Sequence, residues 1–81
     1  MTIDREWDEP VYRQLAGILR EQIASGELAP RRPIPSVRTL VERYGVARAT
    51  AAKAIQLLAD EGLVRVVKGR GWFVTPEDQR G

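Results

Sequence analysis

The stretch SVRTLVERYGVARATAAKAIQLLADEG, residues 36–62, decides the fold. Ser36 is suited to cap a helix, and the apolar stripe after it ends at Gly45, so residues 37–44 are predicted to form a short helix. After a turn of about three residues, a second helix is predicted from Arg48 to Glu61, and Gly62 ends it. Two short helices joined by a tight turn with a glycine predict a helix-turn-helix.

The second of these helices has a distinct inner and outer side. When its residues are placed at roughly 100° intervals, one cluster is apolar and should face the core. The inner cluster is Ala51, Ala54, Ile55 and Leu58, and the outer cluster is Ala49, Ala52, Lys53, Gln56 and Asp60. The outward face therefore carries unusually few polar side chains near its start.

The flanking segments complete the predicted fold. An apolar stripe runs through residues 11–25 after Pro10 and predicts the first helix, whereas residues 27–35 contain three prolines and should be extended. Beyond the helix-turn-helix, LVRVV and WFVT are separated by KGRG, which predicts a β-hairpin. We expect a mainly α fold with a small β wing, in which three helices and a hairpin form a winged helix-turn-helix.

The chain has 81 residues, enough for one small domain. We predict a flexible leader over residues 1–9, a winged helix-turn-helix domain over residues 10–75 and a polar tail over residues 76–81. Ile3 and Trp7 are large enough to dock the leader on the body of the domain.

Composition excludes several classes of function. The sequence contains no cysteine and no histidine, so disulfides, thiolate metal sites and the usual zinc sites have no ligands. No paired acid and base stands out, so we expect neither an enzyme nor a cofactor or metal site. Apolar runs are too short to span a membrane, and the acidic start is unlike a signal peptide. A soluble, cytoplasmic, nucleoid-associated protein is expected.

Positive charge is concentrated in the middle of the chain. Residues 1–30 hold three basic and six acidic residues, residues 31–58 hold six and one, and residues 59–81 hold four of each, which gives −3, +5 and 0. A segregated basic segment is typical of a protein that binds a polyanion. A solvated face with a chance excess of arginine is the alternative interpretation.

Three blocks of the sequence together resemble the DNA-binding domain of the GntR family of bacterial transcription regulators. They are PVYRQLAGILREQIASGELAP, IPSVRTLVERYGVARAT and LLADEGLVRVVKGRGWFV, within residues 10–75. The resemblance implies a transcriptional regulator, which we expect to be a repressor, that binds double-stranded DNA at a palindromic or repeated operator. Operator symmetry normally demands two copies, so a homodimer on that DNA is expected. No membrane partner is expected, and no small-molecule ligand is evident.

The resemblance also implies DNA-contacting residues in both helices and in the wing. They are Arg38, Arg48, Thr50, Lys68, Gly69, Arg70 and Gly71. The guanidinium group of Arg48 can donate hydrogen bonds to guanine or to a phosphate, and Arg38 can bind a phosphate or contact a base. Thr50 either bonds a phosphate or bonds its own backbone.

Three residues are added from the outer face of the predicted recognition helix. Ala49 and Ala52 can approach base edges and touch thymine methyl groups, although helix propensity alone also explains them. Lys53 either contacts DNA or is solvated.

The predicted wing also leaves alternatives. Arg70 stands between two glycines, so it either enters a narrow minor groove or belongs to a solvated turn that is basic by chance. Trp72 covers the wing, contacts DNA or contacts a partner. Tyr12, Tyr44 and Phe73 are predicted to pack in the core.

The sequence departs from the family pattern at two turns and after the wing. Arg31 stands where many relatives have glycine, so a positive φ there would be strained, and Arg31 and Arg32 could add phosphate contacts. Ala47 replaces the usual helix-capping serine or threonine. Family members generally carry an effector-binding domain after the wing. The alternatives are therefore a stand-alone regulator, a DNA-binding fragment of a larger effector-responsive regulator, or a winged helix that binds protein.

Overall fold

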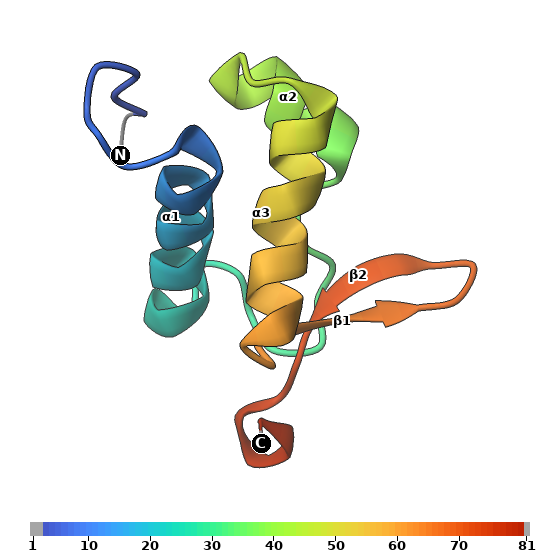
Figure 1. The fold of residues 1–81 in the computed structure, drawn as a ribbon. Helices are drawn as coiled ribbons and strands as arrows, with labels where there is room; N and C mark the ends of the chain where they lie inside the picture. Colours follow the sequence, from blue (N-terminus) through green and yellow to red (C-terminus); the bar gives the residue numbers. More distant parts are fainter. Residues whose placement is uncertain (1–2, 81) are drawn as a thin grey trace.

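The computed structural model describes residues 3–80 and contains three helices and a hairpin in the predicted order (Figure 1). This confirms the winged helix-turn-helix. The elements are α1 (Val11–Ser25), α2 (Val37–Tyr44), α3 (Arg48–Asp60), β1 (Val64–Val67), β2 (Gly71–Val74) and a 3-10 helix, η1 (Glu77–Gln79).

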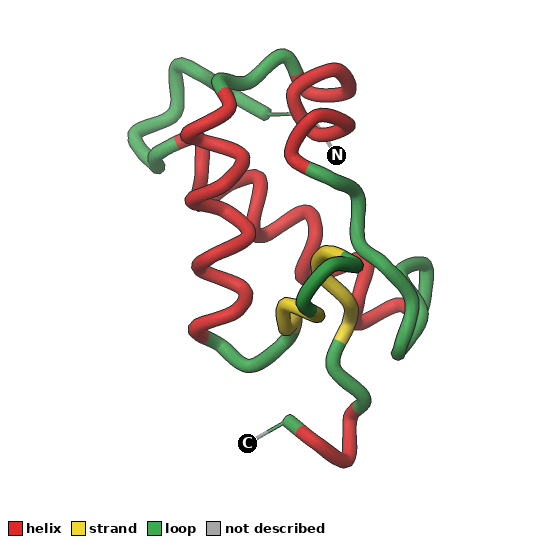
Figure 2. Tube along the Cα trace, turned by 90° about the vertical axis from the view of Figure 1, so that its right-hand side faces the viewer, coloured by secondary structure: helices red, strands yellow, loops and turns green. Residues whose placement is uncertain are grey.

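The core lies where α1, α2, α3 and the base of the hairpin meet. α1 and α3 run side by side and α2 lies across the first turns of α3 (Figures 1 and 2). The predicted inner residues of α3 are all buried. The apolar stripe of α1 is also buried except for its first residue, Tyr12, which is half-buried. The largest fully buried side chains are Leu15, Leu19, Leu40, Ile55, Leu58 and Val74.

The two helices of the helix-turn-helix begin differently. The Ser36 hydroxyl accepts a hydrogen bond from the Thr39 amide at 3.1 Å and so caps α2. Gly45 ends α2 with a φ of 65°, a left-handed conformation that glycine adopts at low cost. Ala47 precedes α3 and makes no side-chain cap, as the sequence predicts. The start of α3 therefore depends on the turn that leads into it.

The hairpin is anchored by the segment before α2. β1 and β2 pair antiparallel, with Val67 opposite Gly71. Main-chain bonds also join β2 to residues 31–34: the Arg31 amide donates to the Val74 carbonyl at 2.9 Å, the Val74 amide to the Arg32 carbonyl at 2.9 Å, and the Ile34 amide to the Trp72 carbonyl at 3.0 Å. Arg31 adopts a φ of 68°, so the turn keeps the left-handed conformation that would be strained at a non-glycine residue.

The ends of the chain also make contacts. Residues 3–9 are hydrogen-bonded to α1 and α2, and in the tail the Arg80 side chain donates to the Thr75 carbonyl at 2.9 Å. Residues 1–2 of the predicted leader and residue 81 of the predicted tail lie outside the described residues, and the flexibility of the leader stays a prediction. Across residues 3–80, no helix has the length and apolar character needed to cross a bilayer.

Candidate nucleic-acid interface

The outer face of α3 is open to solvent. The predicted outer residues Ala49, Ala52 and Lys53 are exposed, as is Arg48 at the start of the helix. Farther along, the Gln56 amide donates to the Asp60 carboxylate at 3.1 Å, so these two side chains bond each other. The first two turns thus present Arg48, Lys53 and small side chains, and the small side chains allow close approach of another surface.

Thr50 lies beside this face and is half-buried. Within residues 3–80 its hydroxyl makes no hydrogen bond to another protein group. The backbone bond that was one alternative for Thr50 is therefore not made in this structure.

Lys53 has a neighbour that the sequence did not reveal. Its ammonium lies 4.2 Å from the centre of the Tyr12 ring, a cation–π contact between α3 and α1. The Tyr12 hydroxyl accepts a hydrogen bond from Arg13 Nε at 3.2 Å, and this bond lowers the pKa of Tyr12 against a smaller opposing effect of burial. Tyr12 packs against the core as predicted and also holds two cations at the surface.

Arg38 projects from the first turn of α2 with 86% of its side chain exposed. Its Nε lies 4.0 Å from the Glu42 carboxylate, one helical turn farther on. Exposed pairs of this kind contribute little to stability. The Arg38 guanidinium is therefore open to an anionic ligand.

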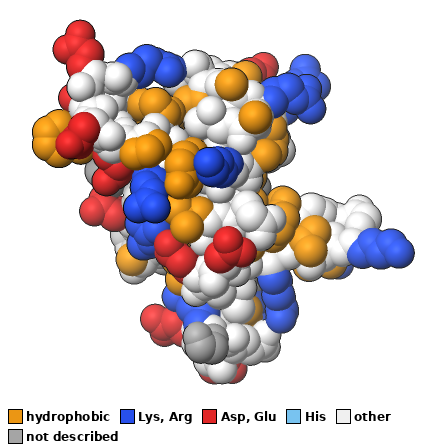
Figure 3. All heavy atoms as spheres, in the orientation of Figure 1, with side chains coloured by type: hydrophobic (Ala, Val, Ile, Leu, Met, Phe, Trp, Pro, Cys, Tyr) orange, Lys and Arg blue, Asp and Glu red, His pale blue; other side chains and the backbone are white. Residues whose placement is uncertain are grey.

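The wing projects from the body and carries cationic side chains at its tip (Figures 1 and 3). Lys68 and Arg70 are exposed there, between strands that end at Val67 and begin at Gly71. Gly69 and Gly71 have φ values of 78° and 100°, so the turn requires glycine for its conformation. A Cβ at either glycine would meet nothing within 4 Å, so space is not the constraint.

Trp72 and Phe73 are both half-buried at the base of the wing. Trp72 packs against the core and lines a cleft of about 280 Å³ between β2 and the segment before α2. Phe73 is bridged to Pro33 on that segment. Of the roles considered for Trp72, covering the wing is the one that its packing supports.

The arginines before α2 lie close to the wing. Arg31 and Arg32 are exposed and precede the helix that carries Arg38. Arg38, Arg48 and the wing tip belong to three elements that contact one another or are joined by this segment. A role for any of these residues in DNA contact stays a prediction.

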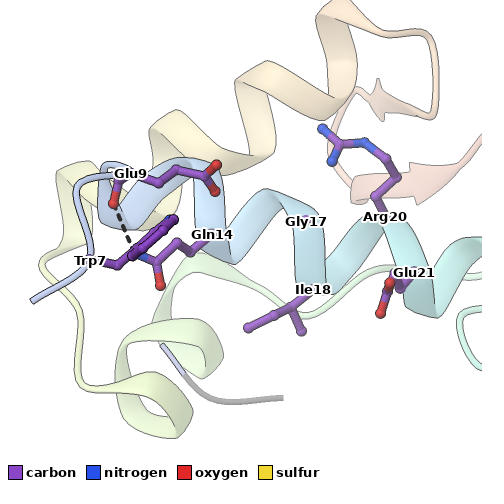
Figure 4. A pocket seen from close by; sticks show the side chains of 7 residues that line it. All are labelled: Trp7, Glu9, Gln14, Gly17, Ile18, Arg20 and Glu21. Atoms are coloured by element: carbon purple, nitrogen blue, oxygen red, sulfur yellow. Dashed lines mark hydrogen bonds between the residues drawn. The ribbon is translucent and has the colours of Figure 1, made fainter. Parts of the chain in front are cut away.

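Another cleft, of about 480 Å³, lies along α1 beside the leader (Figure 4). Its lining mixes carboxylate, amide and aromatic side chains. These residues are Trp7, Glu9, Gln14, Gly17, Ile18, Arg20 and Glu21. Within residues 3–80, no group of three or more potential ligands could hold a metal ion.

The chain matches a known family over most of its length. The family model described as bacterial regulatory proteins, gntR family, matches residues 11–74. The repressor NagR of Bacillus subtilis is 41% identical over 75 residues, which is 93% of this chain. The repressor MngR of Escherichia coli, named for mannosyl-D-glycerate transport and metabolism, is 38% identical over 69 residues, or 85% of this chain. The chain spans 31% and 29% of the lengths of these two relatives.

Solved structures share the fold at similar identities. YtrA from Sulfolobus acidocaldarius, a GntR-family transcription factor, superposes with a TM-score of 0.86 at 42% identity, covering 95% of this chain and 66% of YtrA. The AraR DNA-binding domain, solved with its operator ORE1, superposes with a TM-score of 0.80 at 35% identity, covering 89% of this chain and 88% of that one.

Proposed function

Because the chain belongs to the GntR family of bacterial regulatory proteins, we propose that it binds operator DNA through α3 and the wing and regulates transcription as a repressor. The observation that carries the proposal is that Arg38, Arg48 and the cations of the wing tip are all exposed, on three elements that are packed together or joined by one segment. The AraR domain with the same fold is bound to operator DNA, and NagR and MngR are repressors. These relatives are regulators rather than enzymes.

Within this proposal, α3 enters the major groove and the wing lies along the neighbouring backbone or minor groove. Arg48 contacts a base or a phosphate near the start of α3, while Ala49 and Ala52 let the helix approach base edges closely. Arg38 clamps a phosphate. Thr50, Lys53, Lys68, Gly69, Arg70 and Gly71 complete the proposed contact set.

Two copies of the domain would bind a palindromic or repeated operator, since half-sites on DNA are normally matched by protein symmetry. We place the protein in the cytoplasm, on the nucleoid. The share of NagR and MngR that the chain spans favours a DNA-binding part of a larger effector-responsive regulator as the second candidate.

Selection from random DNA pools at moderate salt tests the proposal. We expect an enriched site with two related half-sites, bound less tightly as salt rises because bound phosphates release counterions. The spacing of the half-sites would report how two copies are arranged. Absence of any enriched sequence would refute sequence-specific binding and favour the protein-interaction alternative.

A further inference from the structure

The described part of the leader, residues 3–9, is attached to the domain at two places. Gln14 of α1 forms the first attachment: its side-chain amide donates to the Asp4 and Glu9 carbonyls at 2.8 Å each, and its Oε1 accepts from the Asp4 amide at 2.8 Å. Figure 4 shows the bond to Glu9 beside Trp7. Ile3 packs against the core as a partly buried side chain. The leader is therefore held on both sides of Arg5.

Arg5 makes the second attachment, at the end of α2. Its Nη2 donates to the Gly45 carbonyl at 2.7 Å and to the Tyr44 carbonyl at 3.4 Å. The last carbonyls of a helix have no partner within the helix and carry partial negative charge. A guanidinium at this position satisfies them and stabilises the end of α2 against fraying.

These carbonyls open the turn of the helix-turn-helix. Gly45 is followed by Val46, which is buried at 4% exposure, and by Ala47, which does not cap α3. The direction in which α3 leaves the turn is thus held by the glycine conformation, the buried valine and the Arg5 bonds. No side chain at the start of α3 contributes a cap of its own.

Resting on the proposed function, we infer that Arg5 is a positioning residue for DNA recognition. By holding the turn between α2 and α3, Arg5 fixes the angle at which Arg48 and the exposed alanines of α3 enter the major groove of DNA. The leader belongs to the DNA-binding unit through this contact. A direct bond from Arg5 to a phosphate is a different role, and the experiment below separates the two.

The test uses Arg5→Ala, Arg5→Lys and the control Arg43→Ala. Arg43 is also an exposed cation in the last turn of α2 and makes no side-chain hydrogen bond within residues 3–80. Affinity is measured for the enriched site and for random DNA over a range of salt concentrations. The ratio of the two affinities is independent of the folded fraction, so a partly unfolded variant remains informative.

For Arg5→Ala we expect specific affinity to fall about fivefold, the equivalent of one net hydrogen bond, with random-DNA affinity and the salt slope unchanged. Arg5→Lys should recover part of the loss, and Arg43→Ala should leave the ratio unchanged. In the free protein, amide hydrogen exchange at Gly45 should become about fivefold faster in Arg5→Ala.

Two results would overturn the inference. Equal losses on specific and random DNA, with a salt slope reduced by about 1, would make Arg5 a phosphate contact. If Arg5→Ala shows unchanged amide exchange at Gly45 and binds DNA like Arg43→Ala, the Arg5 contact has no role in positioning α3. If the wild-type protein enriches no DNA sequence, the proposed function fails, while exchange in the free protein still decides whether Arg5 holds the turn.

Discussion

α3 and the wing are the two regions proposed to meet DNA, and the chain supports them in opposite ways. α3 is seated on the core by four buried residues, with Ala51 and Ala54 at 0% exposure. The wing is joined to the body along its base only, and its tip is exposed. α3 presents small side chains together with the cations Arg48 and Lys53, and the wing tip presents Lys68 and Arg70. α3 and the wing tip therefore each carry two exposed cations, and the two regions differ in how firmly the rest of the molecule holds them.

The largest expected effect concerns the seating of α3. Leu58→Ala removes a side chain with 0% exposure and should lower the free energy of unfolding by about 2 to 5 kcal/mol, through lost burial and a residual cavity. Val66→Ala on the wing, where Val66 is 61% exposed, should change it by less than about 0.5 kcal/mol. Urea denaturation measures both. Equal losses would contradict the contrast between the two regions.

The next effect concerns what each region reads on DNA. Arg48→Ala should weaken binding to the enriched site by about 1 to 3 kcal/mol and relax one base preference, because a bidentate contact is lost. Arg70→Ala should leave that preference intact and relax preference for a narrow minor groove beside it. Selection from random pools with each variant separates these outcomes. Unchanged selectivity for Arg48→Ala would mean that Arg48 only clamps a phosphate.

A smaller effect should come from the uncapped start of α3. Ala47→Ser supplies the hydroxyl that Ser36 supplies for α2, and it should raise the free energy of unfolding by about 1 kcal/mol. The matched control Ser36→Ala should lower it by a similar amount. Thermal or urea denaturation checks both variants. A neutral Ala47→Ser would show that the turn cannot orient a hydroxyl toward the first amides of α3.

The smallest effect depends on pH and concerns the attachment of α3 to α1. Arg20 bonds Glu61 through Nε at 2.8 Å and Nη2 at 2.7 Å, and this lowers the pKa of the Glu61 carboxyl from its ordinary value of 4.5. Because the folded pKa is lowered, the stabilisation is present above the unfolded pKa and is lost as pH falls through the folded one. Since the side chains are 42% and 34% exposed, it should stay below about 1 kcal/mol.

Glu61→Gln should therefore be slightly less stable than the wild-type protein near neutral pH. The difference should vanish in acid, where the carboxylate of the wild-type protein is protonated. Urea denaturation from pH 7 to pH 3 measures the difference. A gap that persists at the acid end would assign the effect to packing.

Much of this arrangement could be predicted from the sequence because it follows from local patterns. Periodic apolar residues placed all three helices, and the inner and outer sides of α3 are as expected. The third helix ends at Asp60, one residue before the predicted end, and β2 begins at Gly71 instead of Trp72. The missing cap at Ala47 followed from residue type, whereas the positive φ at Arg31 was left open by the sequence and is known only from the structure.

The contacts that could not be predicted join residues far apart in the chain. Lys53 over Tyr12 and Arg5 on Gly45 each depend on how α1, α2 and the leader are placed in space. Periodic apolar residues in the sequence predict a helix, but a single polar side chain has no such pattern that would identify its partner. The pairing of residues 31–34 with β2 was not predicted because prolines disfavour strand pairing. The pairing can form because the amides of Arg31 and Ile34 are the donors, and Pro33, which has no amide hydrogen, is not needed as one.

That pairing has a mechanical consequence. Three main-chain bonds tie residues 31–34 to the wing, and Ser36 at the start of α2 follows only two residues later. The backbone bonds, together with Pro33 and Pro35, therefore limit how far the wing can move relative to α2, the helix that carries Arg38. We expect the spacing between the wing and α2 to be nearly the same in the free protein and in a complex with DNA, so that a duplex has to match this spacing.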